Sequence, residues 1–547
     1  MKIIFRTAVL LFLLGCVCTV SAQPTLTLEQ QVAQMFMVTI HGAQLPEAGR
    51  DFLQRWQPGA VVLFTSNIGP PEQITRLTNS YQQAITDAGG LPLLIAVDQE
   101  GGRVQRLGQG FTTLPTPALY AAAATNNPEL IKEMGRAVAE ELSAVGINMN
   151  LAPVADLETN PNNPIITRRS FGSDPEVVGR ALNAYVEGLQ SGGVLATLKH
   201  FPGHGETAED SHVELPILPF DRERLLSTEA LAFQRAMNAE AIMAAHIWFP
   251  AIEPQPNLPA SLSPNIINGL LRQDLGYNGI VMTDAIDMDA VDIQYNYEQI
   301  SVMAIKAGVD MIAVGPGIGL KPAEAMIQAV IDAVHSGEIP EERIRESAQR
   351  IIDAKTRFGL LDWQPLDPAT TEARMNKPAH ENVLNRVFQA GVTIVYDRND
   401  LLPVPPDRPV AVAYLGTRNY TIPACEAHRS GIRWVAVTFT PMPQDIALAV
   451  DAAGHVDTII VFTENAFENA QQQALVQALP PEKTVVVALS SPYDWQYFPD
   501  VAAYVLTHSL LPQSIPAACA VLFGAYPAQG VLPITLSPDL PAGIYAD

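Results

Sequence analysis

Eight short apolar segments recur through the first part of this 547-residue chain, and most are separated by stretches with a helical pattern. The segments are 35–40, 60–64, 92–98, 148–154, 196–201, 241–246, 279–284 and 311–315. Strands that are apolar on both faces and alternate with helices are typical of a parallel sheet. Eight such units within about 300 residues predict a (β/α)8 barrel, of the TIM type. An open doubly wound sheet would show the same periodicity.

The remainder of the chain indicates a second, smaller domain. A chain of 547 residues is too long for one hydrophobic core. After about residue 360 a loop-rich connector is followed by renewed alternation of strand and helix. We therefore predict a catalytic barrel over 24–362, a linker over 363–382 and an α/β sandwich domain, with helices on both faces of its sheet, over 383–547.

The first residues have the features of an export signal. Lys2 and Arg6 form a basic start, an apolar run follows, and Val20-Ser21-Ala22 gives a cleavage pattern of small residues. We predict a signal peptide over 1–22 and an exported protein, secreted, periplasmic or at the cell surface. The apolar run is too short for a comfortable span, so no transmembrane helix is expected in the mature protein. Lipid anchoring at Cys16 is the alternative.

The net charge narrows the classes of partner, and the cysteine content limits the number of disulfides. The formal net charge is -24, which repels phosphate backbones, so we expect no nucleic-acid partner. Outside the signal only Cys425 and Cys519 remain, too few for a disulfide framework. They could pair or be buried as small apolar residues. The sequence does not predict the oligomeric state.

Polar residues stand where several predicted strands end. Asp98 ends one segment, Lys199 and His200 another, His246 a third and Asp284 a fourth. In a (β/α)8 barrel the chemistry is found at the C-terminal ends of the strands. The predicted barrel therefore has a candidate site at its expected place.

The most crowded stretch is "KHFPGHGETAEDSH", residues 199–212. Asp210 and His212 stand two residues apart, and a carboxylate beside an imidazole fixes its tautomer and favours the protonated ring. Such a pair can exchange protons near neutral pH. There are three other interpretations: a metal site of His200, His204 and His212 with a carboxylate, and a loop whose polar groups only satisfy its backbone. The third is a Ser-His-Asp triad with Ser211, which is disfavoured because Ser211 lies between its partners and has no elbow motif.

The stretch "VMTDAIDMDA", residues 281–290, offers a carboxylate at a strand end. Asp284 leaves a buried strand, so it can act as a nucleophile or as an electrostatic stabiliser. Asp287 and Asp289 follow in the turn, where aspartates often cap helices or face solvent. We expect chemistry only from Asp284.

Two further stretches combine arginine with a strand end or a loop. In "AVDQEGGRVQRL", Asp98 is followed by Arg103 and Arg106, which can fork onto sugar hydroxyls or a carboxylate, or can brace the barrel rim. In "NPIITRRSFG", one of Arg168 and Arg169 could reach the pocket while the other is ordinary surface.

Together these four stretches, in this order, resemble glycoside hydrolase family 3 and its bacterial β-N-acetylglucosaminidase branch. The segments "VVVALSSPYDW" and "VLFGAYPAQGVLPITL" are similar to the C-terminal domain of that family. The resemblance covers nearly the whole mature chain. It implies a retaining exo-β-N-acetylglucosaminidase in which Asp284 is the nucleophile and His212, paired with Asp210, is the acid/base.

The resemblance also implies the residues that hold the sugar, which are Asp98, Arg106, Arg169, Lys199 and His200. It implies a carbohydrate substrate that contains N-acetylglucosamine, with no metal and no cofactor. A β-N-acetylglucosaminide phosphorylase, a β-glucosidase of the same family and a non-catalytic sugar-binding protein are the alternatives. An exported enzyme would meet peptidoglycan fragments (muropeptides) or chitin oligosaccharides, and the sequence does not choose between them.

Overall fold

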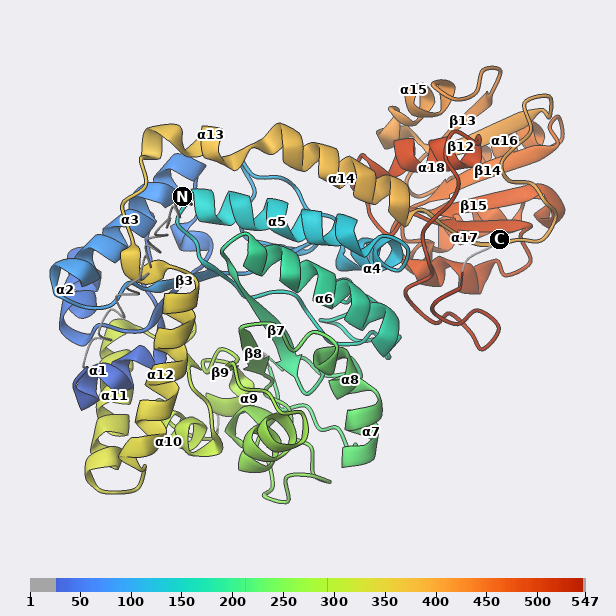
Figure 1. Cartoon of the computed structure of the whole chain (residues 1–547). Coiled ribbons are helices and arrows are strands. Elements are labelled where there is room, and N and C mark those ends of the chain that lie inside the picture. Colours follow the sequence, from blue (N-terminus) through green and yellow to red (C-terminus); the bar gives the residue numbers. More distant parts are fainter. Residues whose placement is uncertain (1–25, 212, 293, 545–547) are drawn as a thin grey trace, which may run out of the picture.

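The computed structural model describes residues 26–211, 213–292 and 294–544 (Figure 1). The predicted signal peptide and Cys16 lie outside the described residues, as does His212. In the part of the chain that is described, no helix is both long enough and apolar enough to cross a bilayer.

The N-terminal part is a barrel of eight parallel strands, and each of the eight predicted segments supplies one strand. In chain order they are β1 (Phe36–Thr39), β2 (Ala60–Leu63), β3 (Leu94–Val97), β6 (Met149–Asn150), β7 (Leu195–Phe201), β8 (Ala241–Ala244), β9 (Ile280–Thr283) and β10 (Ile312–Ala313). Each pairs with the next, β10 pairs with β1, and a bridge from Met282 to Met311 joins β9 to the start of β10. The predicted barrel is confirmed.

Helices surround the barrel. They are α1 (Leu28–Gln34), α2 (Glu47–Trp56), α3 (Pro71–Asp87), α4 (Pro117–Ala124), α5 (Pro128–Ala144), α6 (Pro175–Ser191), α7 (Arg222–Ser227), α8 (Glu229–Gln234), the π-helical η3 (Asn265–Asp274), α9 (Asp289–Asp292), α10 (Tyr297–Ala307), α11 (Leu320–His335) and α12 (Glu341–Arg357). Local sequence sets their ends. The Asp174 side chain, for example, accepts hydrogen bonds from the first backbone N–H groups of α6, and Gly192 and Gly193 end that helix.

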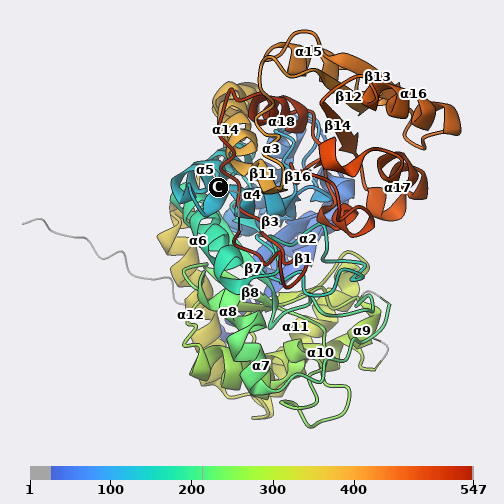
Figure 2. The same cartoon turned by 90° about the vertical axis from the view of Figure 1, so that its right-hand side faces the viewer.

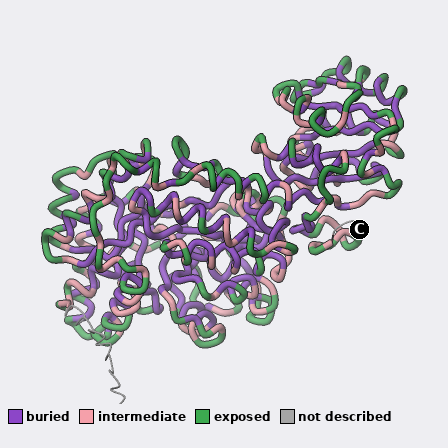
Figure 3. Tube along the Cα trace, turned by 45° about the horizontal axis from the view of Figure 1, so that its top comes forward, coloured by how far each residue is buried: buried purple, intermediate pink, exposed green. Residues whose placement is uncertain are grey.

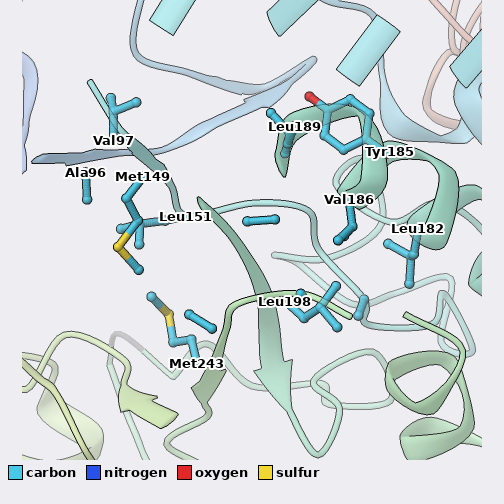
Figure 4. Packing of buried hydrophobic residues seen from close by; sticks show 14 of the residues in the cluster. Ala96, Val97, Met149, Leu151, Leu182, Tyr185, Val186, Leu189, Leu198 and Met243 are labelled. Carbon is cyan, nitrogen blue, oxygen red and sulfur yellow. The ribbon is translucent and has the colours of Figure 1, made fainter. Parts of the chain in front are cut away.

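The core lies inside the barrel and between the strands and helices. Figure 4 shows Met149, Leu151 and Met243 directed into the barrel interior, while Tyr185 and Leu189 of α6 lie beyond the strands. All of these side chains are buried. Helices α5 and α6 approach closely because both carry glycine at the crossing. A Cβ on Gly188 would lie 2.2 Å from the carbonyl oxygen of Lys132.

The C-terminal part is a six-stranded sheet with helices, again as predicted. Its strands are β11 (Thr393–Asp397), β12 (Val410–Leu415), β13 (Arg433–Val437), β14 (Thr458–Thr463), β15 (Thr484–Ala488) and β16 (Ala503–Leu506). Their order is β11-β16-β15-β14-β12-β13, and only β11 is antiparallel to its neighbour. Helices α15 (Thr421–Glu426), α16 (Pro443–Ala453), α17 (Ala470–Gln477) and α18 (Ser514–Leu522) flank the sheet. Figure 3 shows two buried interiors, one in each part of the chain.

Cys425 of α15 and Cys519 of α18 form a disulfide. Both residues are also fully buried, so the two interpretations left open by the sequence, pairing and burial, are both correct. The bond links the first and last helices of the C-terminal domain.

Two connections join the domains. Within the predicted linker 363–382, the chain forms α13 (Thr371–Met375) and begins α14 (Lys377–Gly391), which runs along α4 and α5 and leads into β11 (Figures 1 and 2). The end of the chain returns to the barrel, where Val531 N donates to Ala122 O and Ser173 N donates to Pro533 O. A stretch predicted to be a linker is thus largely helical, because its apolar residues pack on the barrel.

Candidate active site

A cavity of about 430 Å³ opens at the C-terminal ends of the barrel strands. Its polar lining residues are Asp98, Glu100, Arg106, Arg169, Lys199, His200, Asp284 and Asp287, and its apolar ones include Met37, Phe64, Leu151 and Met243. Six residues predicted for the site, Asp98, Arg106, Arg169, Lys199, His200 and Asp284, therefore meet in one space.

One wall of the cavity is a network of two cations and two carboxylates. Lys199 Nζ lies 2.7 Å from Asp98 Oδ1 and 2.7 Å from Glu100 Oε1. Arg169 donates through both Nε and Nη2 to Glu100, at 2.8 Å each. Burial would raise the pKa of Glu100, but Lys199 and Arg169 lower it to about 2. Glu100, Lys199 and Arg169 therefore stay charged across the physiological pH range, and the pairing fixes the donors before any ligand arrives.

Arg106 stands at the rim of the same wall. The short hairpin of β4 (Gln99–Gly101) and β5 (Val104–Gln105) places it after the turn, with Arg106 N donating to Asp98 O. Its guanidinium lies 3.9 Å from Asp98 and over the ring of Phe64. The side chain is 36% exposed, so its remaining donors can meet a ligand.

His200 is held by Asp156, a residue that the sequence did not indicate. Asp156 Oδ2 lies 2.6 Å from His200 Nδ1, and the carboxylate also accepts from the backbone N–H groups of His200 and His204. Burial would raise the pKa of Asp156, but the imidazole and these hydrogen bonds lower it. With Nδ1 facing Asp156, the Nε2 atom of His200 is directed toward Arg169 Nη2, 3.4 Å away.

Asp284 directly follows β9 and lines the same cavity. Its backbone N–H donates to Ala244 O, and Ala285 N donates to its Oδ1 at 2.8 Å. Burial would raise its pKa, but His200, His246, the Ala285 N–H and Lys199 outweigh burial and lower it. Asp284 is therefore ionised and partly desolvated, which suits a nucleophile.

The structure gives roles to two neighbours of Asp284, His246 and Asp287, that the sequence did not predict. His246 Nε2 lies 3.0 Å from Ala285 O, so the imidazole braces the turn that presents Asp284. Asp287 was expected to cap a helix or face solvent. It instead lines the cavity and accepts from Gly317 N at 2.5 Å, because Gly315 and Gly317 leave room for its carboxylate.

The loop 202–211 is built around His204. Its Nε2 lies 2.9 Å from Ser211 Oγ and its Nδ1 2.9 Å from Thr207 Oγ1. Burial lowers the pKa of His204 to about 4, so the ring is neutral. Both ring nitrogens have partners, which leaves neither for the metal that the sequence allowed His204 to bind. The structure describes Asp210 at the end of this loop, and the partner predicted for it, His212, lies outside the described residues.

A second cavity, of about 90 Å³, lies between the barrel and the C-terminal domain. Glu158 and Arg168 line it from the barrel, and Tyr493 and Glu468 from the other side. Burial raises the pKa of Glu158 to about 8 despite its hydrogen bond with Tyr493 and the nearby Arg168. Arg168, the neighbour of Arg169, is thus directed away from the main cavity and lies 4.0 Å from Glu468.

Comparison with known proteins agrees with this arrangement. Residues 27–354 match the glycosyl hydrolase family 3 N terminal domain. A "Beta-hexosaminidase A" of Pseudoalteromonas piscicida is 29% identical over 90% of this chain and 92% of its own length. A "Beta-hexosaminidase" of Stenotrophomonas maltophilia is 40% identical over 47% of this chain and 76% of its own length.

Among solved structures, a glycoside hydrolase family 3 β-N-acetylglucosaminidase from Paenibacillus sp. is similar with a TM-score of 0.76 and 33% identity, over 94% of this chain and 99% of that one. The likeness covers the barrel and the second domain together. Barrel, cavity and family model thus lead to one assignment, which confirms the predicted resemblance: the chain belongs to glycosyl hydrolase family 3.

Proposed function

We propose that this protein is a β-N-acetylhexosaminidase that removes terminal β-linked N-acetylglucosamine from oligosaccharides. Relatives named as β-hexosaminidases and a similar structure named as a β-N-acetylglucosaminidase support the activity. The observation that carries the proposal is the position of Asp284. It is an ionised carboxylate that lines the same cavity as the wall of fixed donors and acceptors.

We propose a retaining double displacement on this geometry. Asp98, Lys199, His200, Arg169 and Arg106 hold the hydroxyl groups of the terminal sugar. Asp284 attacks the anomeric carbon, and the glycosidic bond breaks as the leaving oxygen takes a proton. A water molecule then hydrolyses the glycosyl ester and releases the sugar with its original configuration.

We assign the role of proton donor to the leaving oxygen to His212, with Asp210 as its partner, because of the motif 199–212. The loop that ends in Ser211 is held by His204, whose backbone N–H donates to Asp156 and whose Nε2 lies 2.9 Å from Ser211 Oγ. The exported location and a substrate from peptidoglycan or chitin also stay proposals, supported by the N-terminal sequence alone.

The first experiment compares two aryl β-glycosides, one of N-acetylglucosamine and one of glucose, with and without phosphate. Preference for the N-acetyl sugar without stimulation by phosphate supports the proposal. Preference for glucose would indicate a β-glucosidase, stimulation by phosphate a phosphorylase, and inactivity on both sugars a binding protein. Nuclear magnetic resonance of the first product formed tests retention, because an inverting enzyme would release the α-anomer.

Variants test the two catalytic roles. Asp284→Ala should abolish turnover, while Asp289→Ala, which removes an exposed carboxylate from the same turn, should not. His212→Ala should slow a glycoside with a poor leaving group far more than one with a nitrophenol, since only the former needs a proton. Equal losses on both substrates would refute the acid role, and His428→Ala, on an exposed histidine, is the control.

A further inference from the structure

Arg106 is followed by a loop, residues 107–114, that is closed on itself by glutamine side chains. Gln99 Oε1 accepts from Leu107 N at 3.0 Å, and Gln105 Nε2 donates to Leu107 O at 2.8 Å and to Thr112 O at 3.1 Å. The Oε1 atom of Gln105 accepts from Leu114 N. These contacts join the loop and the residues on either side of Arg106, Gln105 and Leu107, into one hydrogen-bonded unit.

This unit is tied to the barrel by Glu141 of α5. Its carboxylate accepts from Thr112 N at 2.9 Å and from Thr112 Oγ1 at 2.5 Å. Glu141 is buried, with 7% of its side chain exposed. A buried carboxylate needs further donors or a positive charge, and Thr112 supplies only neutral donors.

The positive charge comes from His380 of α14. His380 Nδ1 lies 3.0 Å from Glu141 Oε1, and its Nε2 lies 2.9 Å from Glu140 Oε2. A ring whose two nitrogens both face carboxylate oxygens must donate from both, which only the imidazolium form can do. Burial would lower the pKa of His380, but the two glutamates outweigh burial and raise it.

We propose that Glu141 and His380 are positioning residues that hold Arg106 at the rim of the active-site cavity. Helix α14, which leads into the C-terminal domain, would thereby help to set the sugar site of the barrel. The inference rests on the proposed function in one respect, namely that Arg106 binds the substrate. A shift of Arg106 by about 1 Å would then weaken binding by an order of magnitude or more.

Few other charged groups face His380. On α5 they are Glu140 and Glu141, while α4 and α18 carry no Asp, Glu, Lys, Arg or His. Arg374 of α13 donates to Ala144 O, and Lys377 and Glu381 of α14 are at least partly exposed. We call the contact between Glu141 and His380 the clamp. The pH at which the clamp weakens is therefore set by His380 itself, and the clamp should loosen as the pH rises through the raised pKa of His380.

The test compares Glu141→Gln and His380→Gln with Arg106→Gln and with Arg386→Gln. Arg386 pairs with Glu133, so its variant breaks another α14–α5 contact without touching the loop. With the N-acetylglucosamine aryl glycoside, Glu141→Gln should raise KM about tenfold, with kcat changed less than twofold. Arg386→Gln should leave both constants unchanged.

A double-mutant cycle separates positioning from general loosening of the barrel. If Glu141 acts through Arg106, the Glu141→Gln/Arg106→Gln protein should bind no worse than Arg106→Gln alone. Additive losses would overturn the inference, and so would a tenfold KM rise in Arg386→Gln. An inactive wild-type protein would instead refute the proposed function.

The pH dependence gives an independent measurement. In the wild type, KM should rise above the pKa of His380, and His380→Gln should show a high KM without that rise. The 15N chemical shifts of His380 should report both ring nitrogens protonated at neutral pH. A neutral ring at pH 6.5 would overturn the clamp regardless of activity.

Discussion

Lys355 of α12 offers a test of the physical argument that does not involve catalysis. The side chain is fully buried, and its Nζ donates to Gln34 Oε1 at 2.7 Å. Gln34 in turn donates to Gln57 O at 2.8 Å. Among the described residues no carboxylate pairs with Lys355, and burial alone lowers its pKa from 10.5 to about 7.

The size and sign of the effect follow from linkage. A shift from 10.5 to about 7 corresponds to roughly 5 kcal/mol, at about 1.4 kcal/mol per unit. The unfolded chain keeps Lys355 charged up to pH 10.5, whereas the folded chain releases the proton near pH 7. The unfolded state therefore binds more protons between these values, so stability rises with pH across the window. The full penalty applies below pH 7.

Lys355→Met removes the buried charge and keeps the volume of the side chain. It also leaves Gln34 Oε1 without the donor that Lys355 supplied, which costs about 1–3 kcal/mol. We expect a net gain in the free energy of unfolding of roughly 2–4 kcal/mol at pH 7, shrinking to nothing or reversing near pH 10. Urea unfolding of the barrel, followed at pH 7 and at pH 9.5, measures both values.

The matched control is Lys306→Met, because Lys306 is exposed and pairs with Glu338. It should change stability by less than about 1 kcal/mol at either pH. A Lys355→Met protein that is no more stable than the wild type at pH 7 would refute the reasoning. So would a gain that is the same at both pH values.

Three further predictions concern the site and the second domain. Glu158→Gln should flatten the fall in stability expected between pH 4.5 and 8, because the pKa raised to about 8 makes the folded state hold a proton that the unfolded state releases; an unchanged pH profile would contradict this. Asp156→Asn should lower kcat/KM about a hundredfold while the fold is kept, since His200 loses the carboxylate that orients it; near-normal kinetics would contradict that role. Replacing Cys425 and Cys519 with alanine should destabilise the C-terminal domain by about 4 kcal/mol, because the bond spans 94 residues, and equal destabilisation of the barrel would argue against the domain division.

The barrel was predictable because its strands are buried on both faces. Segments such as 60–64 and 279–284 are continuous apolar runs, and helical patterns lie between most of them. The linker was harder, since α14 is amphipathic over only part of its length and gains its stability from α4 and α5. The sequence pattern of α14 alone does not indicate its contact with α4 and α5.

The site was predictable where a polar residue ends an apolar strand. Asp98, Lys199 and Asp284 have that signal. Glu100 lies two residues past a strand end, within a quoted motif, and Asp156 two residues past another segment, and each could have been found by searching the first turn after every strand. Asp287 could not, because its place in the cavity depends on the space left by two glycines distant in sequence. The catalytic and binding roles of these residues stay predictions.

The return of the chain end to the barrel has a mechanical consequence. A domain tethered at one point can swivel freely, but this one is fastened at α14 and again at residues 531–535. Side-chain contacts add to these two attachments, among them Arg168 with Glu468 and Thr116 with the His508 carbonyl oxygen. Thr535 N also donates to Ser173 Oγ, beside the N-cap of α6, so this segment is attached to the barrel. Severing the chain after residue 529 would remove the second attachment and leave α14 and these side-chain contacts to fix the orientation of the domain.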